Sequence, residues 1–202
     1  MTDTMITLDK PTLEWMLGPA QPMLSMVSTG LAGLTDEEYL WEPVDGCWSV
    51  RPRSEQRTAP DDHRPEGDWG LDIEYPDPVP APFTTIAWRL MHMTGSVYVA
   101  AAALRGRCSN DGPVDSNWPQ DRAVPTTAPA AVERWEDAVN TLRGLLAEAG
   151  PEDLRRMERQ YWDPDPTPVA EHVFFYGYFE VASHAAEIRL LRDLYRLRQT
   201  WR

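Results

Sequence analysis

The stretch VAEHVFFYGYFEVASHAAEIRLLRDLYRLR occupies residues 169–198 and decides how this sequence folds. It follows the run PDPTP at residues 164–168, and prolines are typical of the residues that open a helix. Within the stretch, Glu180 and His184 are four residues apart, which places their side chains on one helix face, one turn apart. We therefore expect a long helix over residues 169–198 on which these two side chains can reach a common ion.

Three further segments have apolar residues at helical spacing. The first covers residues 7–34, and Pro19 and Pro22 should kink or interrupt it. The second covers residues 84–104, where apolar residues recur every three or four positions. The third covers residues 129–149 and stops at a Gly-Pro pair. Four long helices predict an all-α protein, folded as one four-helix bundle domain over residues 1–202.

Two long connections interrupt this pattern. Residues 43–82, between the first and second helices, are rich in Pro, Asp, Gly and Arg and exceed the usual length of a helix connection. We expect a functional or partly disordered loop that lies over one end of the bundle. Residues 110–125, between the second and third helices, form the other loop. Short helices are predicted over residues 37–41, after a capping box, and over residues 152–159.

The charge balance narrows the range of partners. The chain has 32 Asp and Glu against 19 Lys and Arg, a formal net charge of -13, so its surface should repel nucleic acids and anionic membranes. Apolar runs stay shorter than the roughly 20 residues that span a bilayer, and no basic and apolar leader stands at the start. We expect a cytoplasmic protein in which Cys47 and Cys108 remain reduced.

His92 is the third residue that could take part in a metal site. In the second helix it lies beside the apolar stripe, which favours a position in the bundle interior. Two imidazoles and a carboxylate suit a divalent metal, Zn²⁺, Ni²⁺ or Fe²⁺, and three protein ligands leave open positions for water or substrate. The alternative is an ordinary ion pair or buried hydrogen bond, because Glu and His four residues apart are common on helices.

Three segments carry a resemblance to a known family. The run EVASHAAEIRLLRDLY at residues 180–195 resembles the end of the last helix in DinB-like proteins of the actinobacterial branch. WEPVDGCWSVR at residues 41–51 and FTTIAWRLMH at residues 83–92 resemble the first loop and second helix of the same group. This superfamily includes the mycothiol-dependent maleylpyruvate isomerases and related thiol transferases. The similarity extends from about residue 8 to residue 197 and implies a DinB-like bundle.

The resemblance also implies a ligand set and a reaction class. In the superfamily a His from the second helix and a pair on the last helix, usually His and His, hold the metal. These positions map onto His92, Glu180 and His184, so Glu180 departs from the usual pattern. A carboxylate can still ligate, although a lineage that has lost its metal would show the same change. The implied co-substrate is a small thiol such as mycothiol.

Other residues are candidates for supporting roles. Trp41, Trp48 and Trp69 fall in loop-like segments, where they could wall a substrate pocket or simply pin the loops to the bundle. His172 could hydrogen-bond a metal ligand or be a packed histidine. Glu187 could hydrogen-bond the free ring nitrogen of His184 or form a salt bridge. His63 is read as solvated, and Cys47 as a small buried residue outside the site.

Three functions remain open at this point. The first is a metal-dependent thiol transferase or isomerase that acts on a small electrophile. The second is a module that binds or sequesters a hydrophobic small molecule without catalysis. The third is a hydrolase or isomerase in which the metal activates water and no thiol takes part. A homodimer is possible with any of them.

Overall fold

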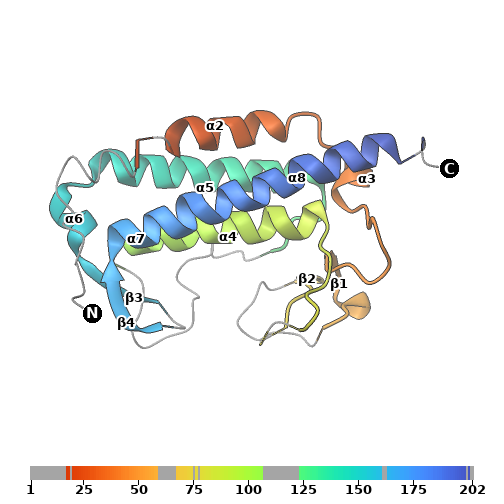
Figure 1. Cartoon of the computed structure of the whole chain (residues 1–202), viewed down its shortest axis with the longest axis horizontal. Helices are drawn as coiled ribbons and strands as arrows, with labels where there is room; N and C mark the ends of the chain where they lie inside the picture. Colours follow the sequence, from red (N-terminus) through yellow and green to blue (C-terminus); the bar gives the residue numbers. More distant parts are fainter. Residues whose placement is uncertain are drawn as a thin grey trace.

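Figure 1 shows the long helices of the protein lying side by side as a bundle, in a computed structural model of the chain. The structure describes residues 17–18, 20–58, 67–74, 76, 78–106, 123–160, 163–198 and 200. The bundle consists of α2 (Ala20–Gly30), α4 (Ile86–Leu104), α5 (Ala128–Glu148) and a fourth helix built from three consecutive segments. The all-α class predicted from the sequence is confirmed.

The fourth helix runs without a break through α7 (Val169–Phe174), the π-helical segment η3 (Phe175–Phe179) and α8 (Glu180–Leu197). A π-helical turn inside an α-helix is rare and is found mostly near functional sites. Gly177 is buried in this turn, and a Cβ atom there would lie 3.2 Å from Leu142 Cδ2 and 3.5 Å from Ala100 Cβ. The missing side chain therefore lets the π-helical turn pack closely against both α4 and α5.

Helix α4 is the central helix of the bundle. Sixteen of its 19 residues are buried, and the exceptions are Arg89, His92 and Gly95. It packs against α5 on one side and against α7, η3 and α8 on the other. Although α4 is almost wholly buried, no helix in the described part of the chain is long and apolar enough to cross a membrane. Arg89 and His92 lie on the partly open side of this helix.

The first predicted helix is interrupted and ends early. Leu17 is helical and Gly18 is a turn, so the helix is interrupted beside Pro19, as expected, before α2 begins at Ala20. Helix α2 gives way to turns after Gly30, four residues before the expected end. Pro22 lies in the first turn of α2, where its missing N–H removes no helical hydrogen bond, so the expected interruption there is wrong. Pro19 lies outside the described residues. The short helix α3 (Asp36–Tyr39) follows, capped by Thr35 as predicted.

The long connection before α4 contains a small sheet that the sequence analysis did not predict. Strand β1 (Val50–Pro52) pairs antiparallel with β2 (Trp69–Leu71), and the 3₁₀ turn η1 (Arg53–Glu55) follows β1. The carboxylate of Asp72, which is fully buried, accepts hydrogen bonds from the backbone N–H groups of Ser49 and Arg57 and from the Arg51 guanidinium. This carboxylate organises the connection into an ordered layer.

A second small sheet lies at the other end of the bundle. The chain forms α6 (Pro151–Arg155) and then turns into β3 (Met157–Gln160), which pairs antiparallel with β4 (Asp163–Pro168). The short helix predicted over residues 152–159 therefore ends early. The proline-rich run before α7 is a strand, because each proline holds the residue before it in an extended conformation. The long helix begins directly after it at Val169, as predicted. Prolines are tolerated here since both strands are edges.

Candidate metal centre

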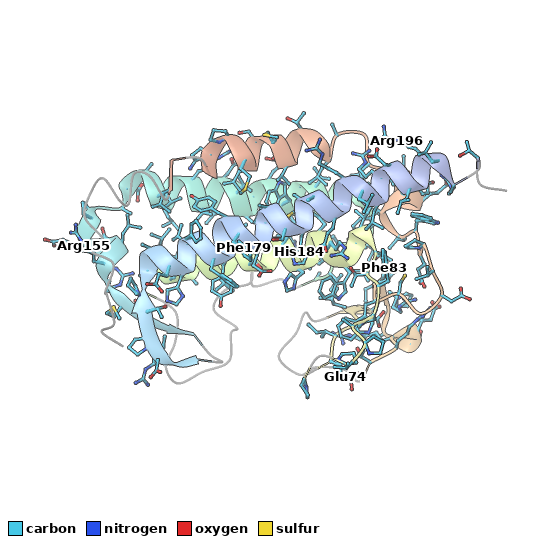
Figure 2. The ribbon with its side chains drawn as sticks, viewed as in Figure 1. Glu74, Phe83, Arg155, Phe179, His184 and Arg196 are labelled. Atoms are coloured by element: carbon cyan, nitrogen blue, oxygen red, sulfur yellow. The ribbon has the colours of Figure 1, made fainter. Side chains whose placement is uncertain are left out.

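Helices α4 and α8 bring His92, Glu180 and His184 together. Glu180 Oε2 lies 3.4 Å from His92 Nε2 and 3.3 Å from His184 Nε2. One ligand atom from each residue can be chosen so that all three lie within 4.8 Å of one another. In Figure 2, His184 lies near the middle of the long C-terminal helix, and Phe179 lies about one turn nearer to α7.

These separations fit a metal ion between the three side chains. They are longer than the roughly 2.9–3.0 Å of an ordinary N–H···O hydrogen bond. Metal–ligand bonds to His and Glu are about 2.0–2.2 Å, so two ligands on a tetrahedral ion are about 3.3–3.6 Å apart. The two measured separations fall in that range. The donor set, two imidazole nitrogens and a carboxylate, also matches the preference of first-row divalent metals.

The cluster is partly open to the outside. The side chains of His92, Glu180 and His184 are 33%, 21% and 17% exposed. A site closed on all sides would be typical of a structural ion, whereas accessible ligands leave room for a further molecule. The arrangement therefore has the character of a site that can exchange a ligand.

Hydrogen bonds within the cluster favour the ionised form of Glu180 and the protonated form of His184. Hydrogen bonds from His184 and then His92 lower the pKa of Glu180 to about 2, against the opposing effect of burial. Burial by itself would lower the pKa of His184, but its hydrogen bonds with Glu180 and Glu187 outweigh burial and raise it. Glu180 is therefore a carboxylate at any physiological pH, as a metal ligand must be.

Glu187 lies behind His184, one turn further along α8. Its Oε2 is 2.7 Å from His184 Nδ1, which leaves Nε2 of the same ring directed at Glu180. A carboxylate on the far nitrogen of a metal-binding histidine fixes its tautomer and its orientation. The suggested role of Glu187 remains a prediction, but it has the geometry that this role requires.

Arg89 completes this end of the cluster and was missed by the sequence analysis. Its guanidinium pairs with Glu187 Oε2 and lies 3.3 Å from His184 Nδ1. Burial lowers the pKa of Arg89, opposed by the charge of Glu187. One signal could have revealed it: Arg89 is the only Asp, Glu, Lys or Arg in the helix that carries His92. A single charge in a buried helix needs a partner.

Trp88 is the second residue that the sequence analysis missed. Its ring stacks on the imidazole of His92, with centroids 4.9 Å apart and an interplanar angle of 8°. The edge contact with His184 has a centroid distance of 6.3 Å. Because Trp88 and His92 are four residues apart on a helix, their spacing alone would have placed them on one face.

The three tryptophans proposed as a pocket wall lie in different places. Trp48 is buried, with its ring 6.1 Å from Trp88, so it lies behind the cluster. Trp41 packs edge-on against Tyr195 near the end of α8, at 5.5 Å. Trp69 is half-buried on β2. The structure thus connects one of the three with the cluster through Trp88, and a substrate pocket walled by all three remains a prediction.

His172 is buried at the junction of α7 with the β3–β4 hairpin. Its Nε2 lies 3.0 Å from Thr167 Oγ1 and 3.2 Å from the carbonyl oxygen of Glu158. These contacts join the helix to the hairpin, and they lend no support to a role behind the metal ligands. Cys47 is also buried, and its thiol donates to the Val44 carbonyl oxygen. His63 and Cys108 lie outside the described residues.

Comparison with known proteins agrees with the fold. A family model described as the DinB superfamily matches residues 23–188 of the 202-residue chain. The matched region contains all three residues of the cluster as well as Trp88, Arg89 and Glu187. Neither the comparison with curated proteins nor that with solved structures finds a match. Since the family model covers most of the chain, this protein belongs to the DinB superfamily.

Proposed function

We propose that this protein is a divalent-metal-dependent enzyme that uses a low-molecular-weight thiol, such as mycothiol, to modify a small electrophilic molecule. The observation that carries the proposal is the convergence of His92, Glu180 and His184 at separations that suit a metal ion, with each side chain partly exposed. Resemblance to thiol transferases and isomerases of the same superfamily supports the choice of a thiol.

The residues of the cluster have distinct roles in this proposal. His92 and His184 would hold Zn²⁺, Ni²⁺ or Fe²⁺ through Nε2, and Glu180 through its carboxylate. The bound cation would favour the thiolate over the thiol, whose unperturbed pKa is about 8.5. Glu187 orients His184 through Nδ1, and Arg89 balances the negative charge of Glu187.

The same nucleophile can serve two reactions. In a transfer, the sulfur forms a bond to an electrophilic carbon, and the leaving group departs with the electron pair of the bond that breaks. In an isomerisation, the sulfur adds to a conjugated double bond and is later expelled, so the thiol is regenerated. The partly open side of the cluster gives both co-substrates access to the ligand side chains.

The first experiment is elemental analysis of the untagged protein after purification and reconstitution. We compare the wild type with His184→Ala and Glu180→Gln, and Glu171→Gln serves as the matched control because Glu171 is exposed on the same long helix. We expect about one metal per chain in the wild type and in the control, and little in the other two variants. A reconstituted wild type without metal would refute the proposal and favour a non-catalytic binding module.

A second experiment tests the thiol. The metal-loaded protein is incubated with electrophilic small molecules in the presence and absence of mycothiol, and loss of the electrophile is measured. Turnover that requires the thiol and is lost in His184→Ala is the expected result. Metal-dependent turnover without any thiol would show a hydrolase or a thiol-independent isomerase instead.

A further inference from the structure

We propose that Trp88 is the positioning residue for His92, and this inference rests on the proposed metal site. The two histidines of the cluster differ in how their far nitrogens are held. His184 Nδ1 meets the carboxylate of Glu187 at 2.7 Å. For His92, no residue in the described part of the chain hydrogen-bonds Nδ1. The plane of the His92 ring is therefore not fixed by a hydrogen bond on its far nitrogen, as that of His184 is.

The indole of Trp88 is placed to do so. It lies nearly parallel to the imidazole of His92, at 8° and 4.9 Å between centroids. Offset stacking of this kind is favourable, and it restricts rotation of the imidazole about its χ2 angle. The edge of the same indole lies beside His184, whose ring is nearly perpendicular to that of His92, at 84°. One side chain thus supports both imidazoles.

Trp88 is itself firmly held. Its Nε1–H donates to the carbonyl oxygen of Asp72 at 2.7 Å, and its side chain is buried. Asp72 in turn belongs to the ordered layer between α3 and α4, and its backbone N–H donates to the carbonyl oxygen of Ser49. The indole of Trp48 also neighbours that of Trp88, with ring centroids 6.1 Å apart. The orientation of His92 is therefore set by a layer distant from it in sequence.

This arrangement predicts a graded effect of substitution. Trp88→Phe keeps a flat ring but loses the hydrogen bond to Asp72, whereas Trp88→Leu loses the stacking as well. Trp69→Phe is the control, because Trp69 belongs to the same layer but is half-buried on β2. Co²⁺ is the probe: its affinity is measured by competition with a chelator, and its visible absorption spectrum reports the geometry of its ligands.

We expect Co²⁺ to bind about 10- to 100-fold more weakly to Trp88→Leu, the range typical when a residue that orients a metal ligand is lost. For Trp88→Phe we expect a few-fold loss and an altered spectrum, and for Trp69→Phe no change. A wild type that does not bind Co²⁺ would refute the metal site itself. A wild type that binds, with Trp88→Leu within about twofold of it, would overturn only the role of Trp88.

Trp88→Leu could fail to fold, since it opens a cavity at a buried position. Near-ultraviolet circular dichroism of the metal-free variants tests this before any titration. If Trp88→Leu is unfolded, Trp88→Phe decides alone. An unchanged Co²⁺ spectrum and affinity in folded Trp88→Phe would then overturn the inference, and a weakened affinity with a changed spectrum would support it.

Discussion

His172 and His184 lie twelve residues apart on one long helix and have different surroundings. His172 is only 2% exposed, and its Nε2 contacts a threonine hydroxyl and the backbone carbonyl oxygens of Thr167 and Glu158. His184 is partly exposed, with a carboxylate near each ring nitrogen and a second imidazole at 4.8 Å.

The comparison shows what distinguishes a structural histidine from a candidate ligand. At His172 the partners are neutral groups of the adjacent hairpin, and the ring uses Nε2 to hold the fold together. At His184 the orienting contact is on Nδ1, so Nε2 is directed into the cluster. The two histidines differ in exposure, in the charge of their hydrogen-bond partners, and in the ring nitrogen that the orienting partner contacts.

The largest expected effect that distinguishes His184 from His172 is the pH dependence of metal binding. Hydrogen bonds with Glu180 and Glu187 raise the pKa of His184 despite burial, so a proton competes with the metal below that pKa. Glu180, with a pKa of about 2, stays ionised throughout. Zinc affinity is expected to fall by up to about tenfold per pH unit as the pH decreases below the raised pKa of His184.

In the metal-free protein, the contribution of His184 to stability should be greatest at low pH, where metal binding is weakest. A group whose pKa is raised by folding contributes stability that is present at low pH and is lost as pH rises through the folded pKa. The melting-temperature increase caused by zinc is therefore expected to grow from the acid to the alkaline side. Differential scanning calorimetry with and without zinc measures it, and a pH-independent increase would argue against His184 as a ligand.

Removal of the Glu187 carboxylate, which contacts His184 Nδ1, should have the next largest effect on zinc affinity. In Glu187→Ala, the imidazole loses its orienting partner and Arg89 loses its counter-charge. We expect about tenfold weaker zinc binding with one metal per chain still reached at saturation. Glu187→Gln, which retains an oxygen acceptor, should lose less. Equal affinity in the wild type and Glu187→Ala, measured by chelator competition, would remove Glu187 from the site.

Substitution of His172 should have the smallest effect on metal binding and a clear effect on the stability of the fold. His172→Ala leaves the hairpin contacts unmade in a buried position, which should lower the free energy of unfolding by about 1–3 kcal/mol. Urea denaturation measures this loss, and elemental analysis of the folded variant should still find about one metal per chain. A folded His172→Ala protein that has lost its metal would show that the two regions are not separate.

The sequence was sufficient for the features that depend on helical spacing. Two residues four apart on one helix share a face, and His92 lies at the edge of an apolar stripe. The resemblance to DinB-like proteins then implied that the three side chains converge. Glu187, three residues beyond His184, was named for the same reason. Thr35 belongs to the capping box predicted before the first short helix, and it caps α3.

The remaining features depend on contacts between distant segments. The layer with β1 and β2 is organised by Asp72, whose partners lie 15 to 23 residues earlier in the chain, and nothing in the local pattern distinguishes it from any loop aspartate. The β3–β4 hairpin likewise depends on contacts with α7 through His172. Trp88 lies inside α4 among apolar residues, so its sequence pattern is that of an ordinary core residue.

The π-helical turn before Glu180 has a consequence for the way chain length can change in this helix. A π-helical turn holds one more residue than an α-helical turn, because its hydrogen bonds join residues five apart rather than four. Deleting one residue from η3 would therefore convert the turn to α-helix and leave His172 at the hairpin and His184 in the cluster. A homologous helix that is α-helical throughout would therefore align with this one only across a one-residue gap, placed between residues that serve two different neighbours.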